Sequence, residues 1–202
     1  MPPDINKLKS GVAALLIGWV VFIDNHAHQL FVSLTPKPSG YDQHGRPVFI
    51  SEGQARRLVA KVIGYITKAQ GFAPDYICFH ELQKNGNHHY HLVMSNINLS
   101  LPEFGPIKER CDSKGYKHLC LTGLEIKARD IMGSSCFRLW GGLDANLTAS
   151  FYLSRDLLKQ DRDGQGVEIS PHYGKRDRKR KQLSFAMSVW STRLRTEATI
   201  QD

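Results

Sequence analysis

Residues 75–95 read Asp-Tyr-Ile-Cys-Phe-His-Glu-Leu-Gln-Lys-Asn-Gly-Asn-His-His-Tyr-His-Leu-Val-Met-Ser, and this stretch decides the fold. Residues 75–83 and 88–95 are rich in apolar, β-branched and aromatic side chains, a composition that favours strands. Between them lies Asn85-Gly86-Asn87, and an Asn-Gly pair is a strong local signal for a hairpin turn. The stretch therefore predicts two antiparallel strands joined by a tight turn.

Two histidines separated by one residue occupy the second strand of this hairpin. Successive side chains of a strand point to opposite faces, so His89 and His91 share a face while Tyr90 points toward the core. A hairpin turn brings Glu81 opposite the pair. Two imidazoles and a carboxylate can hold Mg²⁺, Mn²⁺ or Zn²⁺ and leave coordination positions for substrate. The carboxylate favours an oxygen-preferring ion, so the pattern predicts a Mg²⁺ or Mn²⁺ site at Glu81, His89 and His91.

His80 is the alternative third ligand of this site. Strand alternation allows only one of the neighbours His80 and Glu81 to face the histidine pair, and the residues alone leave both open. His88 points to the face opposite His89 and His91, where we expect a solvated residue or a DNA contact.

The elements before the hairpin follow from local signals. Residues 28–35 contain β-branched and aromatic residues and stop at Pro36, which predicts a strand followed by a loop to Pro47. Ser51 with Gln54 three residues later has the pattern of a capping box. Apolar residues then recur at helical spacing up to Gly71, so a helix is expected between them.

After the hairpin the signals are weaker. We expect a helix at residues 102–114, a strand at 119–126, a tight turn at Trp140-Gly141-Gly142 near the metal site, and helices at 145–159 and 183–194. The order strand, helix, strand, strand, helix, strand predicts the α+β class: a ferredoxin-like antiparallel sheet with helices on one face.

The composition restricts the class of protein. The 202 residues carry a formal charge of +8 with a pI near 9.4, a balance that attracts nucleic acid. Much of the positive charge lies in a basic run at residues 175–181, which fits a solvated tail and a phosphate-contacting surface equally well. Its cationic residues are Lys175, Arg176, Arg178, Lys179, Arg180 and Lys181.

Cysteine usage and hydropathy indicate a cytoplasmic protein without a membrane partner. Four cysteines without a CxxC pair argue against a zinc ribbon or a secreted disulfide scaffold. The apolar run at residues 12–23 is shorter than the about 20 residues that span a bilayer, and we expect a buried helix or strand there. It also lacks a cleavage site of the signal-peptide kind.

A second set of residues suggests what the metal is for. Tyr152, Arg155 and Lys159 have offsets that place them near one face of the predicted helix at 145–159. A tyrosine oxygen can attack a phosphodiester when cations polarise the phosphate and stabilise the developing charge. The product is a covalent phosphotyrosine, which keeps the bond energy available for rejoining the strand.

These residues together resemble a known family. Glu81, His89-Tyr90-His91 and Tyr152-Leu-Ser-Arg155 look like the second and third motifs of the HUH endonucleases, and Phe31-Val-Ser-Leu-Thr35 looks like the first. The resemblance implies a metal-dependent nickase that cuts single-stranded DNA, leaving a 5′-phosphotyrosyl link and a free 3′-OH. It favours Glu81 over His80 as the third ligand. The order of motifs, histidines before tyrosine, is that of initiators of rolling-circle replication rather than conjugative relaxases.

The chain departs from the family pattern at two positions. Asp156 stands where a second tyrosine occurs in phage initiators, which points to the single-tyrosine type. Arg155 replaces the usual lysine and cannot donate a proton at neutral pH, so Lys159 becomes the candidate acid. The resemblance implies an HUH domain at residues 1–165, with residues 1–27 as an additional element, and a basic extension at 166–202.

The partners follow from the same resemblance. We expect single-stranded or origin hairpin DNA of a plasmid, phage or other mobile element. The chain has no Gly-x-x-x-x-Gly-Lys phosphate loop, so unwinding requires a separate helicase from the host or the element. Two other functions remain open: an HUH-type transposase, and a DNA-binding module in which the histidines are structural and no reaction occurs.

Overall fold

The computed structural model describes residues 18–21, 23, 27–111, 117–140, 153, 166–171 and 173. The chain divides into two compact units: residues 28–140 with 166–170, and residues 1–27, 141–165 and 171–202. In the second unit residues 18–21, 23 and 153 are helical. The rest of the predicted helix at 145–159, and all of that at 183–194, lie outside the described residues. No helix in the described part of the chain is both long and apolar enough to cross a membrane.

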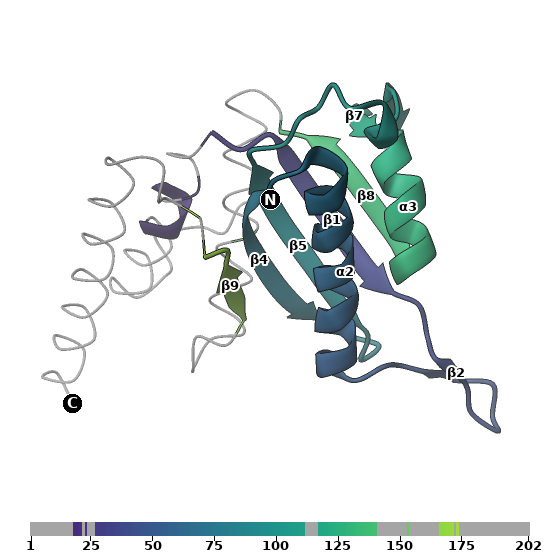
Figure 1. The fold of residues 1–202 in the computed structure, drawn as a ribbon. Coiled ribbons are helices and arrows are strands. Elements are labelled where there is room, and N and C mark those ends of the chain that lie inside the picture. Colours follow the sequence, from purple (N-terminus) through teal and green to yellow (C-terminus); the bar gives the residue numbers. More distant parts are fainter. Residues whose placement is uncertain are drawn as a thin grey trace, which may run out of the picture. The chain divides into compact units, whose positions relative to one another are not determined.

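The first unit is built on one large antiparallel sheet (Figure 1). Its strand order in the described residues is β6-β7-β8-β1-β5-β4-β9, and each neighbouring pair is antiparallel. The strands are β1 (Leu30–Pro36), β4 (Asp75–Leu82), β5 (His88–Ser95), β6 (Ile107–Cys111), β7 (Lys117–Leu121), β8 (Gly133–Leu139) and β9 (Val167–Ile169). The predicted α+β class with an antiparallel sheet is confirmed.

Helix α2 (Glu52–Gln70) begins and ends where the sequence indicated. The Ser51 side chain accepts a hydrogen bond from the Gln54 backbone N–H, and the Gln54 side chain accepts one from the Ser51 N–H, at 2.9 Å. Gly71 terminates the helix with φ +80°, a left-handed conformation that glycine adopts without steric cost. Both ends of α2 are therefore fixed by local chemistry.

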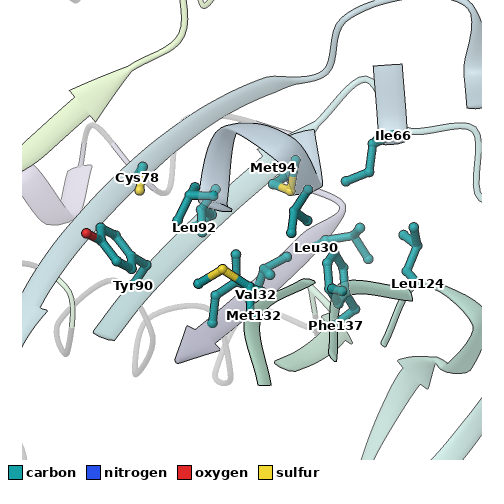
Figure 2. Packing of buried hydrophobic residues seen from close by; sticks show 14 of the residues in the cluster. Leu30, Val32, Ile66, Cys78, Tyr90, Leu92, Met94, Leu124, Met132 and Phe137 are labelled. Carbon is teal, nitrogen blue, oxygen red and sulfur yellow. The ribbon is translucent and has the colours of Figure 1, made fainter. Parts of the chain in front are cut away.

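The core lies between the sheet and two helices, α2 and α3 (Thr122–Met132), which cover the same face (Figure 1). Figure 2 shows alternate residues of the central strands in this core, including Leu30 and Val32 of β1 and Tyr90 and Leu92 of β5. Because strand side chains alternate, the intervening residues of β1 and β5 point to the face that carries no helix in this unit. The predicted core position of Tyr90, 1% exposed, is confirmed.

The β4–β5 hairpin forms as predicted. Gln83 donates its N–H to the Asn87 carbonyl at 2.8 Å, and Gly86 donates to the Gln83 carbonyl at 2.8 Å. Gly86 has φ +85°, the left-handed conformation that closes a three-residue loop. This loop fixes the register that places Glu81 opposite His89.

Two expectations downstream of the hairpin were wrong. Residues 102–114 contain only the 3₁₀ turn η2 (Pro102–Phe104) before β6 begins, although Lys, Glu and Arg favour helix. Backbone pairing with β7 overrides that propensity. The strand expected at 119–126 ends at Leu121, where Thr122 Oγ1 donates to the Pro106 carbonyl at 2.9 Å and α3 begins.

Four further strands were not predicted. Strands β8 and β9 have no expected counterpart, and the loop expected at 36–47 contains a short hairpin of β2 (Gly40–Tyr41) and β3 (Pro47–Val48). The order strand, helix, strand, strand, helix, strand is nevertheless present as β1, α2, β4, β5, α3 and β8. The helix and the strand that complete it each lie later in the chain than expected.

Candidate metal centre

Glu81, His89 and His91 converge on the face of the sheet opposite α2 and α3. One ligand atom from each lies within 4.8 Å of the others. Glu81 Oε2 is 3.7 Å from His91 Nε2, and the two imidazole centroids are 4.4 Å apart with the rings nearly perpendicular, at 81°. The Glu81 side chain is 30% exposed, whereas that of His91 is 7% exposed, so the group opens to solvent on the carboxylate side. Two imidazole nitrogens and a carboxylate oxygen at this spacing fit a divalent cation.

Hydroxyl groups of β1 orient both imidazoles. Ser33 Oγ lies 3.0 Å from His91 Nδ1, and Thr35 Oγ1 lies 2.6 Å from His89 Nδ1. A neutral imidazole has one N–H donor and one acceptor nitrogen. If each Nδ1 carries the proton and donates to its hydroxyl, each Nε2 lone pair is left for a metal. Strand β1 thus supplies a hydrogen-bond partner for the Nδ1 atom of each histidine.

The electrostatic environment keeps His89 neutral. Burial, reinforced by the neighbouring His91 and opposed by Glu81, lowers the pKa of His89 to about 4. At neutral pH the His89 ring is therefore uncharged, and one of its two nitrogens has a lone pair available to a metal ion.

His80 and His88 belong to the opposite face. His80 Nε2 lies 2.8 Å from His88 Nδ1, and the His80 ring stacks on Tyr90 with centroids 4.9 Å apart. Glu81, not His80, is therefore the residue of β4 that joins the histidine pair. His88 faces away from the pair as predicted, but it is half-buried and bonded to His80 rather than solvated.

An aromatic group lies beside the histidines. The Phe31 ring stacks on His91 with centroids 5.4 Å apart, and Trp140 lies 6.5 Å from Phe31 and 5.2 Å from His28. Trp140 was expected near the site, whereas the contact of Phe31 with His91 was not predicted. The signal for Phe31 was available, because strand alternation places it on the same face as Ser33.

The other predicted site residues lie outside the described part of the chain. They are Tyr152, Arg155, Lys159 and the six cationic residues of the run at 175–181. Their roles stay predictions.

In comparisons with known proteins, no family model, no curated protein and no solved structure matches this chain. The function is therefore inferred from the site.

Proposed function

We propose that this chain is a metal-dependent, site-specific nickase and ligase of single-stranded DNA, of the HUH type that initiates rolling-circle replication. The observation that carries the proposal is the convergence of Glu81 with His89 and His91, with both Nδ1 atoms held by β1 hydroxyls. This donor set suits Mg²⁺ or Mn²⁺ and leaves room for phosphate oxygens.

The topology supports the same proposal. The central strands lie in the order β8-β1-β5-β4, and α2 and α3 are the connections that return the chain to the sheet. A ferredoxin-like domain, the fold that the family resemblance implies, has its four strands in this order. Strand β1, which resembles the first family motif, lies next to the histidine strand and supplies Ser33 and Thr35.

The proposed reaction assigns one step to each residue. A divalent cation, when bound by the three ligands, would act as a Lewis acid on the scissile phosphate. The Tyr152 hydroxyl loses its proton to solvent, and its oxygen attacks phosphorus; the O–P bond forms as the bond from phosphorus to the 3′ oxygen breaks. Arg155 stabilises the added negative charge, and Lys159 gives a proton to the leaving 3′ oxygen. Attack by a 3′-OH on the phosphotyrosine reverses the step and rejoins the strand.

The neighbourhood of the site fits single-stranded DNA. Bases stack on exposed aromatic rings with little sequence preference, and Phe31 and Trp140 are half-buried beside the histidines. The charge of +8 favours phosphate binding. Duplex unwinding in the cytoplasm would then fall to a separate helicase.

The test is formation of a covalent adduct. We expect the protein, incubated with a single-stranded origin oligonucleotide and Mn²⁺, to give a denaturant-resistant protein–DNA species. Its cross-linked peptide, identified by mass spectrometry, should contain Tyr152. Tyr152→Phe should abolish the adduct, whereas Tyr41→Phe, which alters a residue 71% exposed on the β2–β3 hairpin, should retain it. An undiminished adduct in Tyr152→Phe would refute the assignment of Tyr152 as the nucleophile.

A second measurement addresses the metal. His91→Ala should lose calorimetric Mn²⁺ binding and cleavage together. DNA binding without cleavage in every divalent metal tested would instead favour the non-catalytic module.

A further inference from the structure

A second potential ligand group lies elsewhere in the sheet unit. Cys120 of β7, Cys136 of β8 and Glu125 of α3 each place one ligand atom within 4.8 Å of the other two. Cys120 and Glu125 are each 1% exposed, and both cysteines are free thiols. The two cysteines are distant in sequence, so a search for CxxC spacing misses them.

Glu125 is an unusual buried carboxylate. Its Oε1 accepts a hydrogen bond from the Phe137 N–H at 3.2 Å. Its Oε2 forms an ion pair with Arg110 at 3.3 Å but accepts no hydrogen bond within the described chain. Burial of a carboxylate is costly unless cations and donors satisfy both oxygens. A metal ion beside Oε2 would give this oxygen a second cationic partner in addition to Arg110.

Neighbouring arginines suit a site of high negative charge. Arg138 Nε donates to Cys136 Sγ at 3.3 Å, and Arg110 contacts Glu125. Two thiolates and one carboxylate carry three negative charges, which a divalent cation and one guanidinium would neutralise. In the metal-free protein, burial and the neighbouring Cys136 and Glu125 raise the pKa of the Cys120 thiol to about 12, so a bound cation must displace the thiol proton.

The cluster also lies where two neighbouring strands of the sheet share few backbone pairs. Strand β7 pairs with β8 only at Cys120↔Arg138, whereas five residue pairs join β6 to β7 and seven join β1 to β8. The β6–β7 hairpin is therefore held to the rest of the sheet by little backbone pairing. A metal bound by residues of β7, β8 and α3 would connect these three elements directly.

We propose that Cys120, Cys136 and Glu125 bind a thiophilic divalent cation, Zn²⁺, at a site separate from Glu81, His89 and His91. Thiolate ligands select zinc over Mg²⁺ and Mn²⁺. Zinc–sulfur bonds of about 2.3 Å and tetrahedral angles bring ligand atoms to about 3.3–3.8 Å apart, so the side chains close by roughly 1 Å on binding. Water takes the fourth position. This site does not depend on the proposed nickase function.

The first test uses Co²⁺ as a coloured substitute for zinc. The measurement uses the full chain, reduced with a phosphine under nitrogen. It carries His89→Ala and His91→Ala, which remove the other metal site. We expect sulfur-to-cobalt charge-transfer absorption in the near ultraviolet at one equivalent of Co²⁺, lost on addition of one equivalent of Zn²⁺. Adding Cys136→Ser should remove most of this absorption, whereas Cys111→Ser, an exposed thiol of β6, should retain it.

A second test needs no substitution and so does not depend on a variant folding. Zn²⁺ should slow alkylation of Cys136 in the reduced natural chain by about tenfold or more, because a metal-bound thiolate is shielded, while Cys111 reacts at an unchanged rate. Absence of the charge-transfer band, an equal band in the Cys136→Ser protein, or unprotected Cys136 would each overturn the proposal.

Discussion

Replacing Thr35 by valine tests whether β1 holds the histidines ready for metal. Valine keeps the branched shape of threonine and removes the hydroxyl that lies 2.6 Å from His89 Nδ1. Without that hydrogen-bond partner the His89 ring can rotate, which moves the Nε2 lone pair away from the metal position. Loss of such a supporting hydrogen bond typically weakens metal binding by about 10- to 100-fold, or roughly 1.4–2.7 kcal/mol.

The structure also ranks two substitutions at this site. Thr35 is the hydrogen-bond partner found for His89, whereas His91 has both the Ser33 hydroxyl at 3.0 Å and the stacked Phe31 ring. We therefore expect Thr35→Val to fall near the upper end of that range and Ser33→Ala near the lower end. Removal of the Ser33 hydroxyl leaves the His91 ring partly fixed by its other contacts.

Titration calorimetry with Mn²⁺ measures both affinities. Thr67→Val is a matched control, because the Thr67 hydroxyl donates only to the Ile63 carbonyl within α2. It should bind Mn²⁺ like the natural chain. If Thr35→Val keeps a native circular dichroism spectrum and binds Mn²⁺ within about twofold of the natural chain, the hydroxyl does not orient His89, and the reasoning fails. A larger loss in Ser33→Ala would reverse the proposed ranking.

Three further predictions concern pH, DNA and packing. Burial sets the folded-state pKa of His89 near 4 against 6.5 for the free side chain, so the unfolded chain takes up the proton first as the pH falls. Between pH 7 and pH 4 the free energy of unfolding of the metal-free protein should therefore fall by about 2–3 kcal/mol more than that of His89→Gln. Urea titrations with chelator measure both, and an equal dependence on pH in the two proteins would contradict this. Phe31→Ala should weaken single-stranded DNA binding by about 5- to 100-fold in fluorescence anisotropy, whereas the 38% exposed Phe72→Ala should not. Gly123→Ala would place Cβ 2.6 Å from the Phe104 carbonyl group and should destabilise the fold by roughly 2–3 kcal/mol, whereas Gly64→Ala meets open space within α2 and should stabilise it by about 0.5–1 kcal/mol; both are read from urea midpoints.

Local chemistry explains which parts of the fold could be predicted from the sequence. The capping box at Ser51, the left-handed Gly71 and the Asn85-Gly86 turn each act within a few residues, and the structure has all three. The alternation of His89, Tyr90 and His91 is equally local. These features therefore predicted α2, the hairpin and the shared face of the two histidines.

Non-local pairing explains the errors. Residues 107–111 have a composition that suits a helix, and only their pairing with β7 makes them a strand. Strand β8 lies beside β1, far away in sequence, and no local signal identified it. The approach of Cys136 to Cys120 was also not predicted, because it depends on the unpredicted strand β8.

The choice of Glu81 over His80 depends on the length of one loop. A two-residue turn at Asn85-Gly86 would pair Lys84 with Asn87, and that register sets His80 opposite His91 and Glu81 opposite Tyr90. The observed loop includes Lys84 and pairs Gln83 with Asn87, which sets Glu81 opposite His89. Gly86, with φ +85°, closes this longer loop where a side chain would be strained. An Asn-Gly pair is compatible with either loop, so the turn signal predicted the hairpin without its register. The backbone conformation of Gly86 thus places a carboxylate rather than a third imidazole beside the histidines, and with it favours an ion that prefers oxygen ligands.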